Sequence, residues 1–290
     1  MLLSHIDEIN EGDNVIIGLG DSFTQGVGAY SLDTWKNIPE NPSVYNISGN
    51  YFIDEQAKNN WVRQLRDNFL PDYKVINLGV NGSGNRSTIR EMYLASIPKN
   101  LGNVIVILMS TALERYDFLK KYTDNTMGQN RHYKWQTIFP VIADRGSISR
   151  LEKEYFEQIW CNQSDILEFL FNISDAQNFC KSRGYKFLFA SAFDPHINRN
   201  SFIKELDTNS KYIDIINWEN FIKINNRNSF MDMIYQLDHD NCKFMYQIHS
   251  EYSSLKMPTT YITPCCHWTI DGNFKVAEYL ANELQNRKLI

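Results

Sequence analysis

Three short apolar runs, separated by loops and helical patterns, constrain the fold of this chain more than any other feature. They lie at residues 14–19, 74–78 and 103–109. None of them alternates apolar with polar side chains, which is typical of parallel strands that helices cover on both faces. Residues 56–70 carry apolar side chains at helical spacing, and residues 87–97 are expected to form a second helix. We therefore expect an α/β fold, a three-layer α/β/α sandwich around a mainly parallel sheet.

The second half of the chain is predicted to continue this alternation less regularly. The expected elements are a long helical region over residues 151–183 broken near 174–175, a strand over 185–190, a short fifth strand at 214–216, a helix over 218–234 and a closing helix over 272–287. No internal repeat or low-complexity linker divides the sequence. We therefore predict one domain over residues 1–290, with a lid or insertion at about 113–150 and an irregular insertion at about 195–262.

The charge balance excludes some classes of partner. The 290 residues include 29 Lys+Arg and 34 Asp+Glu, a formal net charge of -5, and the basic residues are scattered. We therefore expect no nucleic-acid partner. The apolar runs are far shorter than the roughly 20 residues that a membrane span needs, and the start of the chain lacks the pattern of a secretory signal. The default expectation is a cytoplasmic protein without a membrane span.

The five cysteines predict neither a disulfide framework nor a metal site. Their number is odd, and Cys265 and Cys266 are adjacent and cannot easily bridge, which favours reduced thiols. Neither a Cys-x-x-Cys pair nor a Cys/His spacing typical of zinc occurs. The sequence leaves the oligomeric state open.

The segment Gly20-Asp21-Ser22, which follows the first apolar run, is the strongest candidate for chemistry. Ligands of open parallel sheets bind at the carboxyl ends of the strands, so Ser22 lies where a nucleophile is useful. The alternative is that Asp21 and Ser22 only cap a following helix. The segment lacks the third glycine of a dinucleotide fingerprint, no phosphate-binding loop follows a predicted strand, and the pattern is not a Gly-x-Ser-x-Gly elbow.

A nucleophilic serine needs a base, and one of the six histidines has a suitable context. His267 lies in the loop before the closing helix, which packs beside the first strand in many sandwiches of this type. We therefore expect His267 near Ser22 although the two lie far apart in sequence. The alternative is a histidine that caps the closing helix or lines a rim. His196 also follows a predicted strand, and we interpret it as loop structure.

Gly20-Asp21-Ser22, residues 77–82 and residues 267–278 form three blocks that span nearly the whole chain. They resemble, in order, the first, second and last blocks of the SGNH hydrolases, also called GDSL esterases and lipases, with Phe23 in place of the usual leucine. The resemblance implies a flavodoxin-like SGNH hydrolase fold with insertions. It also implies that Ser22 is the nucleophile, that His267 is the general base, and that the backbone N–H groups of Ser22 and Gly82 are oxyanion-hole donors.

At the third block, this chain departs from the pattern of the family. The family has an asparagine after the third strand, and this asparagine is the third oxyanion donor, whereas here Ser110 and Thr111 follow that strand. Either hydroxyl could donate a hydrogen bond, and we expect Thr111 to complete the oxyanion hole. Losing one well-placed donor raises the barrier by about 2.7 to 4 kcal/mol.

The last block departs as well, because Pro264 stands where the family has an aspartate three residues before the histidine. His267 is then oriented by a backbone carbonyl, by a carboxylate from elsewhere such as Asp238 or Asp240, or by no group at all. We expect Asp21 to secure its loop rather than to perform chemistry.

The prediction is a serine esterase that hydrolyses a small acyl ester through a Ser22 acyl-enzyme, with no metal or organic cofactor. The resemblance favours a small-molecule or glycan ester, such as O-acetyl groups on a carbohydrate. Aromatic residues in predicted loops could stack on sugar rings or simply pack among themselves: Trp35, Tyr45, Tyr51, Tyr116, Tyr133 and Trp135. The alternatives are a catalytically weakened SGNH-like protein that binds a glycan or protein partner, which the two departures favour, and an O-acyltransferase.

Overall fold

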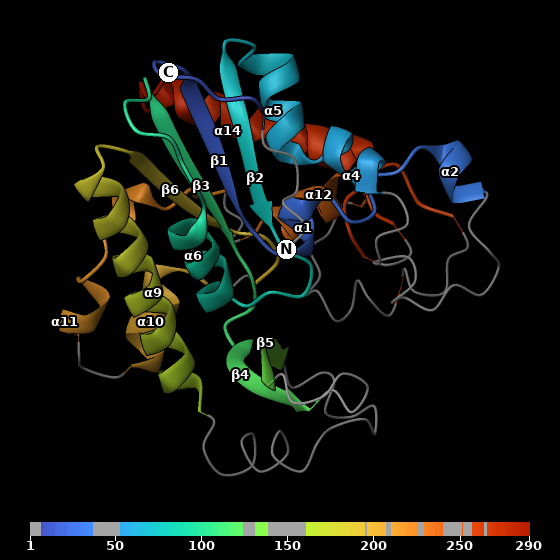
Figure 1. The fold of residues 1–290 in the computed structure, drawn as a ribbon. Helices are drawn as coiled ribbons and strands as arrows, with labels where there is room; N and C mark the ends of the chain where they lie inside the picture. The colour runs from blue at the N-terminus through green and yellow to red at the C-terminus, as the bar shows by residue number, and fades with distance from the viewer. Residues whose placement is uncertain are drawn as a thin grey trace.

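The computed structural model describes most of the chain (Figure 1). The described residues are 7–36, 53–123, 131–138, 161–194, 196–206, 210–224, 229–239, 251, 257–263 and 266–290.

A parallel sheet of four strands forms the centre of the fold. The strands are β1 (Asn14–Gly20), β2 (Tyr73–Gly79), β3 (Val104–Ser110) and β6 (Lys186–Ser191), in the spatial order β2-β1-β3-β6. The three apolar runs predicted as strands are therefore strands, and all three neighbouring pairs are parallel. Their apolar residues are buried on both faces because helices cover both sides of the sheet.

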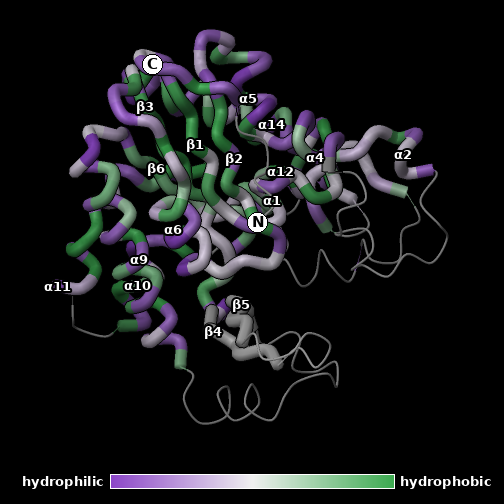
Figure 2. Tube along the Cα trace, viewed as in Figure 1, coloured by the Kyte–Doolittle hydropathy of each residue, from purple (hydrophilic) through white to green (hydrophobic). Residues whose placement is uncertain are grey.

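The helices lie in two layers, which confirms the three-layer α/β/α architecture (Figure 1). One layer contains α5 (Trp61–Phe69), α12 (Phe230–Asp238) and α14 (Ile270–Asn286). The other layer contains α6 (Asn85–Leu94), α9 (Asn162–Ser182), α10 (Arg199–Glu205) and α11 (Ser210–Ile213). Two apolar clusters fill the space between the layers and the sheet, one with Ile16 and Ile105, the other with Ile17 and Val106. Figure 2 shows the hydrophobic strands enclosed by helices of mixed hydropathy.

Several helix boundaries differ from the sequence-based prediction. Residues 56–70 form two helices, α4 (Ile53–Asn59) and α5, because the Asn60 side chain caps α5 by accepting a hydrogen bond from the Arg63 N–H at 3.0 Å. Helix α9 runs without a break through residues 174–175. The neighbouring side chains of Ile173 and Ala176 are buried, so packing maintains the helix where local composition suggested a break.

The predicted fifth strand at residues 214–216 is wrong. These residues form a turn after α11, and Phe221 takes the place beside β6 through a parallel bridge to Phe189. The predicted helix over 218–234 is wrong over residues 218–224, which form a short 3-10 helix (Trp218–Asn220) followed by extended chain. Extended chain is favoured here because Phe221 and Ile222 enter opposite apolar clusters, which requires the two-residue period of a strand.

The described part of the predicted lid at residues 113–150 contains an antiparallel hairpin, β4 (Tyr116–Thr123) and β5 (Arg131–Ile138), which forms a separate two-stranded sheet. Residues 124–130 and 139–150 lie outside the described part, as do 240–250 and 252–256 of the predicted insertion at 195–262. Among the described helices, none combines the length and the apolar character needed to cross a membrane.

Candidate active site

Ser22 lies at the carboxyl end of β1, at the start of the short helix α1 (Ser22–Gln25). The carboxylate of Asp21 caps this helix, because its Oδ1 accepts a hydrogen bond from the Phe23 N–H at 3.1 Å. The capping role that the sequence suggested for Asp21 is therefore confirmed, and Ser22 follows directly after the strand end. The N–H of Ser22 has no hydrogen-bond partner among the described residues.

The structure brings Ser22 and His267 into contact across 245 residues of sequence. His267 Nε2 lies 2.8 Å from Ser22 Oγ, within hydrogen-bond distance. Two hydrogen bonds to Thr263 hold the histidine: the His267 N–H donates to Thr263 Oγ1 at 3.0 Å, and the Thr263 N–H donates to the His267 carbonyl at 2.9 Å. The pair has the geometry that a serine nucleophile and its base require.

Phe23 packs against the imidazole. Its ring centroid lies 4.8 Å from that of His267, 4.7 Å from that of Trp268 and 5.4 Å from that of Phe193. Phe23 is only 3% exposed. The Phe23 ring is therefore buried in direct contact with the His267 ring.

The loop after β2 lies directly beside the Ser22 loop. The Val80 N–H donates to the Gly20 carbonyl at 3.0 Å, and the Asn81 N–H donates to Gln25 Oε1 at 2.7 Å. Gly79 permits this approach, because a Cβ there would lie 2.3 Å from the Gln25 nitrogen. Gly82 has a φ of +75°, a left-handed conformation that favours glycine, and its N–H has no partner among the described residues.

Thr111 does not have a donor to spare for an oxyanion. Its hydroxyl donates to Asp21 Oδ2 at 3.0 Å, and its backbone N–H donates to Asn85 Oδ1 at 2.9 Å. Ser110 is completely buried, and its hydroxyl donates to the Ala190 carbonyl at 2.9 Å. A hydroxyl carries one hydrogen, so the geometry does not support the expectation that Thr111 or Ser110 is the third oxyanion donor.

Arg115 and Asp21 form a buried ion pair beside Ser22. Arg115 Nη1 lies 2.8 Å from Asp21 Oδ2, and the two side chains are 14% and 0% exposed. The same nitrogen donates to the Ser83 carbonyl at 3.0 Å. The guanidinium carbon lies 5.3 Å from the ring centroid of Phe193, in the range of a cation–π contact. The expectation that Asp21 secures its loop agrees with these contacts.

The groups expected to orient His267 are only partly described. Asp238 Oδ2 accepts a hydrogen bond from Thr259 Oγ1 at 2.6 Å, and within the described chain it makes no bond to His267. Asp240 and Pro264 lie outside the described residues.

Trp35, one of the aromatic residues considered for sugar stacking, is 4% exposed and packs on Tyr30.

Tyr116, another of those aromatic residues, is half-buried at the start of β4. Tyr45 and Tyr51 lie outside the described residues, and Tyr133 and Trp135 belong to a strand of which only the backbone is described.

A hollow of about 560 Å³ lies beyond β3 and β6, and Asp194 and His196 line it. The carboxylate of Asp194 accepts hydrogen bonds from the His196 N–H at 2.8 Å and the Leu113 N–H at 3.4 Å. Burial raises the pKa of Asp194 from 3.8 to about 6, with a further contribution from Glu114, although the two hydrogen bonds act in the opposite direction. His196 therefore belongs to a turn around a buried carboxylate, apart from the Ser22–His267 contact.

Metal-ligating groups do not gather in the described part of the chain, where no three His, Cys, Asp or Glu side chains could hold an ion together. Cys161, Cys180 and Cys266 are free thiols, whereas Cys242 and Cys265 lie outside the described residues.

Three residues of this site were not singled out from the sequence. These residues are Arg115, Asn85 and Phe193. Each lies near the end of a strand, but none belongs to the three sequence blocks that resemble those of the SGNH hydrolases. The position of Arg115 five residues beyond β3 was the available signal, because a charged side chain that close to the carboxyl end of a central strand faces the site edge.

The comparisons with known proteins give likenesses of structure alone. No protein-family model matches the chain, and no curated protein matches it. A variant of Axe2, an acetylxylan esterase from Geobacillus stearothermophilus, is similar with 12% identity and a TM-score of 0.42, over 95% of each chain. A Desulfitobacterium hafniense DCB-2 protein assigned to the lipolytic G-D-S-L family has 12% identity and a TM-score of 0.42, over 92% of this chain and 98% of that one. The acetyl xylan esterase AlAXEase has 12% identity and a TM-score of 0.37, over 93% and 99%.

Proposed function

We propose that this protein is a serine esterase of SGNH type that hydrolyses small acyl esters. The observation that carries the proposal is the 2.8 Å contact between His267 Nε2 and Ser22 Oγ at the carboxyl end of the central strand.

The proposed reaction has two halves that use the same pair. Ser22 Oγ attacks the ester carbonyl carbon while its proton passes to His267 Nε2. The tetrahedral intermediate collapses, the C–O bond to the alcohol breaks, and the alcohol leaves with the proton from His267. Water then attacks the acyl-enzyme with His267 as base, and the acid leaves as Ser22 recovers its proton.

The oxyanion of both intermediates is placed at the N–H groups of Ser22 and Gly82. These two donors have no partner among the described residues, and hydrogen bonds from Val80 and Asn81 hold their loops side by side. Donors that are held in place before the reaction stabilise developing charge without reorganisation. A third donor from Thr111 is not part of the proposal, because its hydroxyl is bonded to Asp21.

The substrate class in this proposal is a small acyl ester, with O-acetyl groups on a carbohydrate as the first class to screen. The first test uses p-nitrophenyl acetate, because a small activated ester makes few demands on binding. Turnover by the wild type is expected to fall at least about a thousandfold in Ser22→Ala and in His267→Ala. A fluorophosphonate probe is expected to label the wild type at Ser22, as located by peptide mass spectrometry.

Two variants serve as matched controls. Ser182→Ala removes an exposed serine whose hydroxyl donates to the Phe179 carbonyl, and His196→Ala removes the other histidine that follows a strand. Both are expected to retain turnover at equal folded concentration. Wild-type protein that is no faster than Ser22→Ala and remains unlabelled would overturn the proposal, and glycan binding by that inert protein would favour the binding-protein alternative. Acyl transfer to an added sugar in place of water would favour the acyltransferase alternative.

A further inference from the structure

Arg115, which follows β3, touches the loops that follow the other three strands of the sheet. Its Nη1 donates to Asp21 Oδ2 after β1 and to the Ser83 carbonyl after β2, and its guanidinium faces the Phe193 ring after β6. One side chain thus joins the ends of all four strands at the edge where Ser22 lies.

The two hydrogen bonds of Nη1 reach residues directly adjacent to the proposed oxyanion donors. Asp21 precedes Ser22, and Ser83 follows Gly82. The distances of 2.8 Å and 3.0 Å from one nitrogen constrain the separation of the two loops at the point where their N–H groups must converge on one oxygen. The Ser22 side of this bridge is rigid, because Asp21 also caps α1 and accepts from Thr111.

The electrostatics of the bridge require Arg115 in its present position. Asp21 is completely buried, and an ionised carboxylate removed from water needs a close opposite charge and hydrogen bonds. Arg115 supplies the charge, while the Phe23 N–H and the Thr111 hydroxyl supply hydrogen bonds. The guanidinium is planar, so it can meet the carboxylate and the Ser83 carbonyl in a defined direction, which a lysine ammonium cannot reproduce.

We infer that Arg115 is a positioning residue that sets the geometry of the oxyanion hole through Asp21 and Ser83. This inference rests on the proposed esterase function. Arg115 acts on the N–H groups of Ser22 and Gly82 and does not touch the substrate. Since such donors must lie within about 2.7–3.1 Å of the oxyanion, and a displacement of about 1 Å can cost on the order of a hundredfold in rate, loosening the bridge lowers kcat more than it changes KM.

The test compares two variants at this bridge. Arg115→Lys retains the charge and loses the planar geometry. The double variant Asp21→Asn with Arg115→Met removes both charges, so no unpaired charge is left buried, and the introduced asparagine side chain can still cap α1. In both, kcat for p-nitrophenyl acetate and the rate of fluorophosphonate labelling are expected to fall about 10- to 100-fold, with KM within about twofold of wild type.

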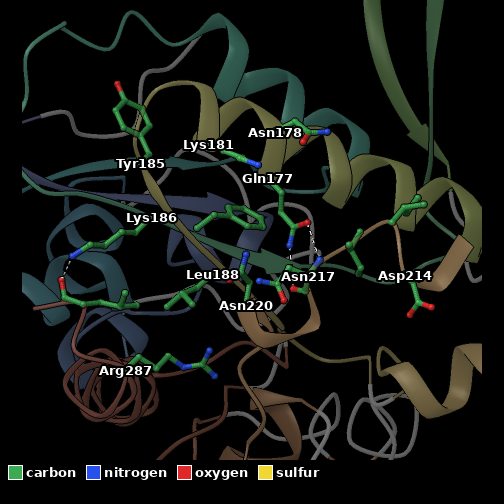
Figure 3. A pocket seen from close by; sticks show the side chains of 14 residues that line it. Gln177, Asn178, Lys181, Tyr185, Lys186, Leu188, Asp214, Asn217, Asn220 and Arg287 are labelled. Atoms are coloured by element: carbon green, nitrogen blue, oxygen red, sulfur yellow. Dashed lines mark hydrogen bonds between the residues drawn. The ribbon is translucent and has the colours of Figure 1, made fainter. Parts of the chain in front are cut away.

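The matched control is Arg287→Lys. Arg287 also joins a carboxylate to backbone carbonyls, because Nε donates to Glu283 at 3.0 Å, Nη2 donates to the Phe221 carbonyl at 3.0 Å and Nη1 donates to the Glu219 carbonyl. It lies in a groove beside the start of β6, near the C-terminal end of α14 (Figure 3). This end is roughly 25 Å along the helix axis from the end next to His267. Arg287→Lys is expected to leave kcat unchanged.

The outcomes separate the inference from the function on which it rests. If the wild type turns over and is labelled, but both bridge variants keep the kcat of Arg287→Lys while remaining folded by circular dichroism, the positioning role is overturned and the esterase stands. A fall confined to stability or to KM also overturns the positioning role. A wild type that shows neither turnover nor labelling overturns the esterase proposal itself, and the inference with it.

Discussion

The two ends of the parallel sheet differ in how their polar groups are used. At the carboxyl end, the N–H groups of Ser22 and Gly82 have no partner among the described residues, and Ser22 Oγ meets His267. At the amino end, a groove of about 860 Å³ beside β6 is the larger of the two hollows described (Figure 3). Two of its polar side chains bond to the protein itself: Gln177 to the Asn217 backbone and Lys186 to the Leu289 carbonyl.

The larger of the two hollows therefore does not coincide with the proposed Ser22–His267 site. Gln177 joins α9 to Asn217, Lys186 joins β6 to Leu289, and Arg287 joins the end of α14 to Glu219 and Phe221, so these side chains stabilise the fold. In the proposed mechanism, the N–H groups of Ser22 and Gly82 instead donate to the oxyanion of the substrate. Substitutions at the two ends should therefore separate stability from activity.

The largest stability effect is expected for Phe23→Ala, which removes the ring that packs on His267 and Trp268. The expected loss in the free energy of unfolding, measured by urea denaturation, is about 3–5 kcal/mol. Turnover per folded molecule should also fall, because the His267 ring loses the side chain against which it packs. Phe187→Ala at the amino end, where Phe187 is 6% exposed, should destabilise comparably and leave turnover per folded molecule unchanged. Phe23→Leu should retain most of both properties. Equal turnover in the two alanine variants would contradict the assignment of Phe23 to the site.

The next effect concerns pH and Asp194. Because burial raises the pKa of Asp194 from 3.8 to about 6, the folded state binds its proton more tightly than the unfolded state does. The stability associated with this proton is present below about pH 3.8 and is lost as the pH rises through about 6. The asparagine of Asp194→Asn does not titrate, so this variant does not lose that stability. The difference in Tm between the variant and the wild type should therefore increase from pH 4 to pH 7, by an amount equivalent to roughly 2–3 kcal/mol in the free energy of unfolding.

The control for this pH effect is Asp214→Asn at the amino-end groove, where the aspartate forms an exposed ion pair with Arg199. Such a pair contributes about 0–1 kcal/mol, so the Tm difference should change little with pH. A Tm difference for Asp194→Asn that is flat or that shrinks from pH 4 to pH 7 would show that the charged form is not disfavoured in the folded protein.

A smaller effect is expected for Gly79→Ala. The added Cβ would lie 2.3 Å from the Gln25 nitrogen and 2.6 Å from the Thr24 carbonyl carbon, so backbone must move. We expect a loss of about 1–3 kcal/mol in thermal unfolding experiments, together with reduced turnover, because α1 moves away from the Gly82 loop. Gly102→Ala at the amino end has a similar clash with the Gly12 carbonyl, at 2.7 Å. Gly102→Ala should lose stability and keep its turnover. If both glycine variants lose turnover to the same extent, the two ends of the sheet do not differ in their effect on activity.

The smallest effect is expected for Gln177→Ala. It removes the reciprocal bonds in which Gln177 Nε2 donates to the Asn217 carbonyl at 3.1 Å and the Asn217 N–H donates to Gln177 Oε1 at 3.0 Å. The loss of stability should be about 0.5–1.5 kcal/mol, read as a shift in the urea midpoint. Ester turnover should stay at the wild-type value, and a change in kcat would indicate that the two ends of the sheet are coupled.

The positions that could be predicted from sequence are those where local pattern and tertiary environment agree. The runs containing Ile16, Val75 and Val106 are strands because continuous apolar sequence suits a sheet buried on both faces. The prediction failed at residues 214–216, where an apolar pair lies in a turn and Phe221 lies beside β6 in its place. Short apolar segments are compatible with several structures, and packing against the sheet selects among them.

The sequence by itself determined the four strands of the parallel sheet, the placement of Ser22 after the first of them and the choice of His267, since these depend on local periodicity and short motifs. Only the tertiary structure decided that His267 reaches Ser22, that the Thr111 hydroxyl is bonded to Asp21, and that Arg115 joins Asp21 to Ser83. Hydrogen bonds between residues distant in sequence depend on the directions in which the chain returns to the sheet edge. Those directions follow from the packing of whole layers, and no local pattern contains them.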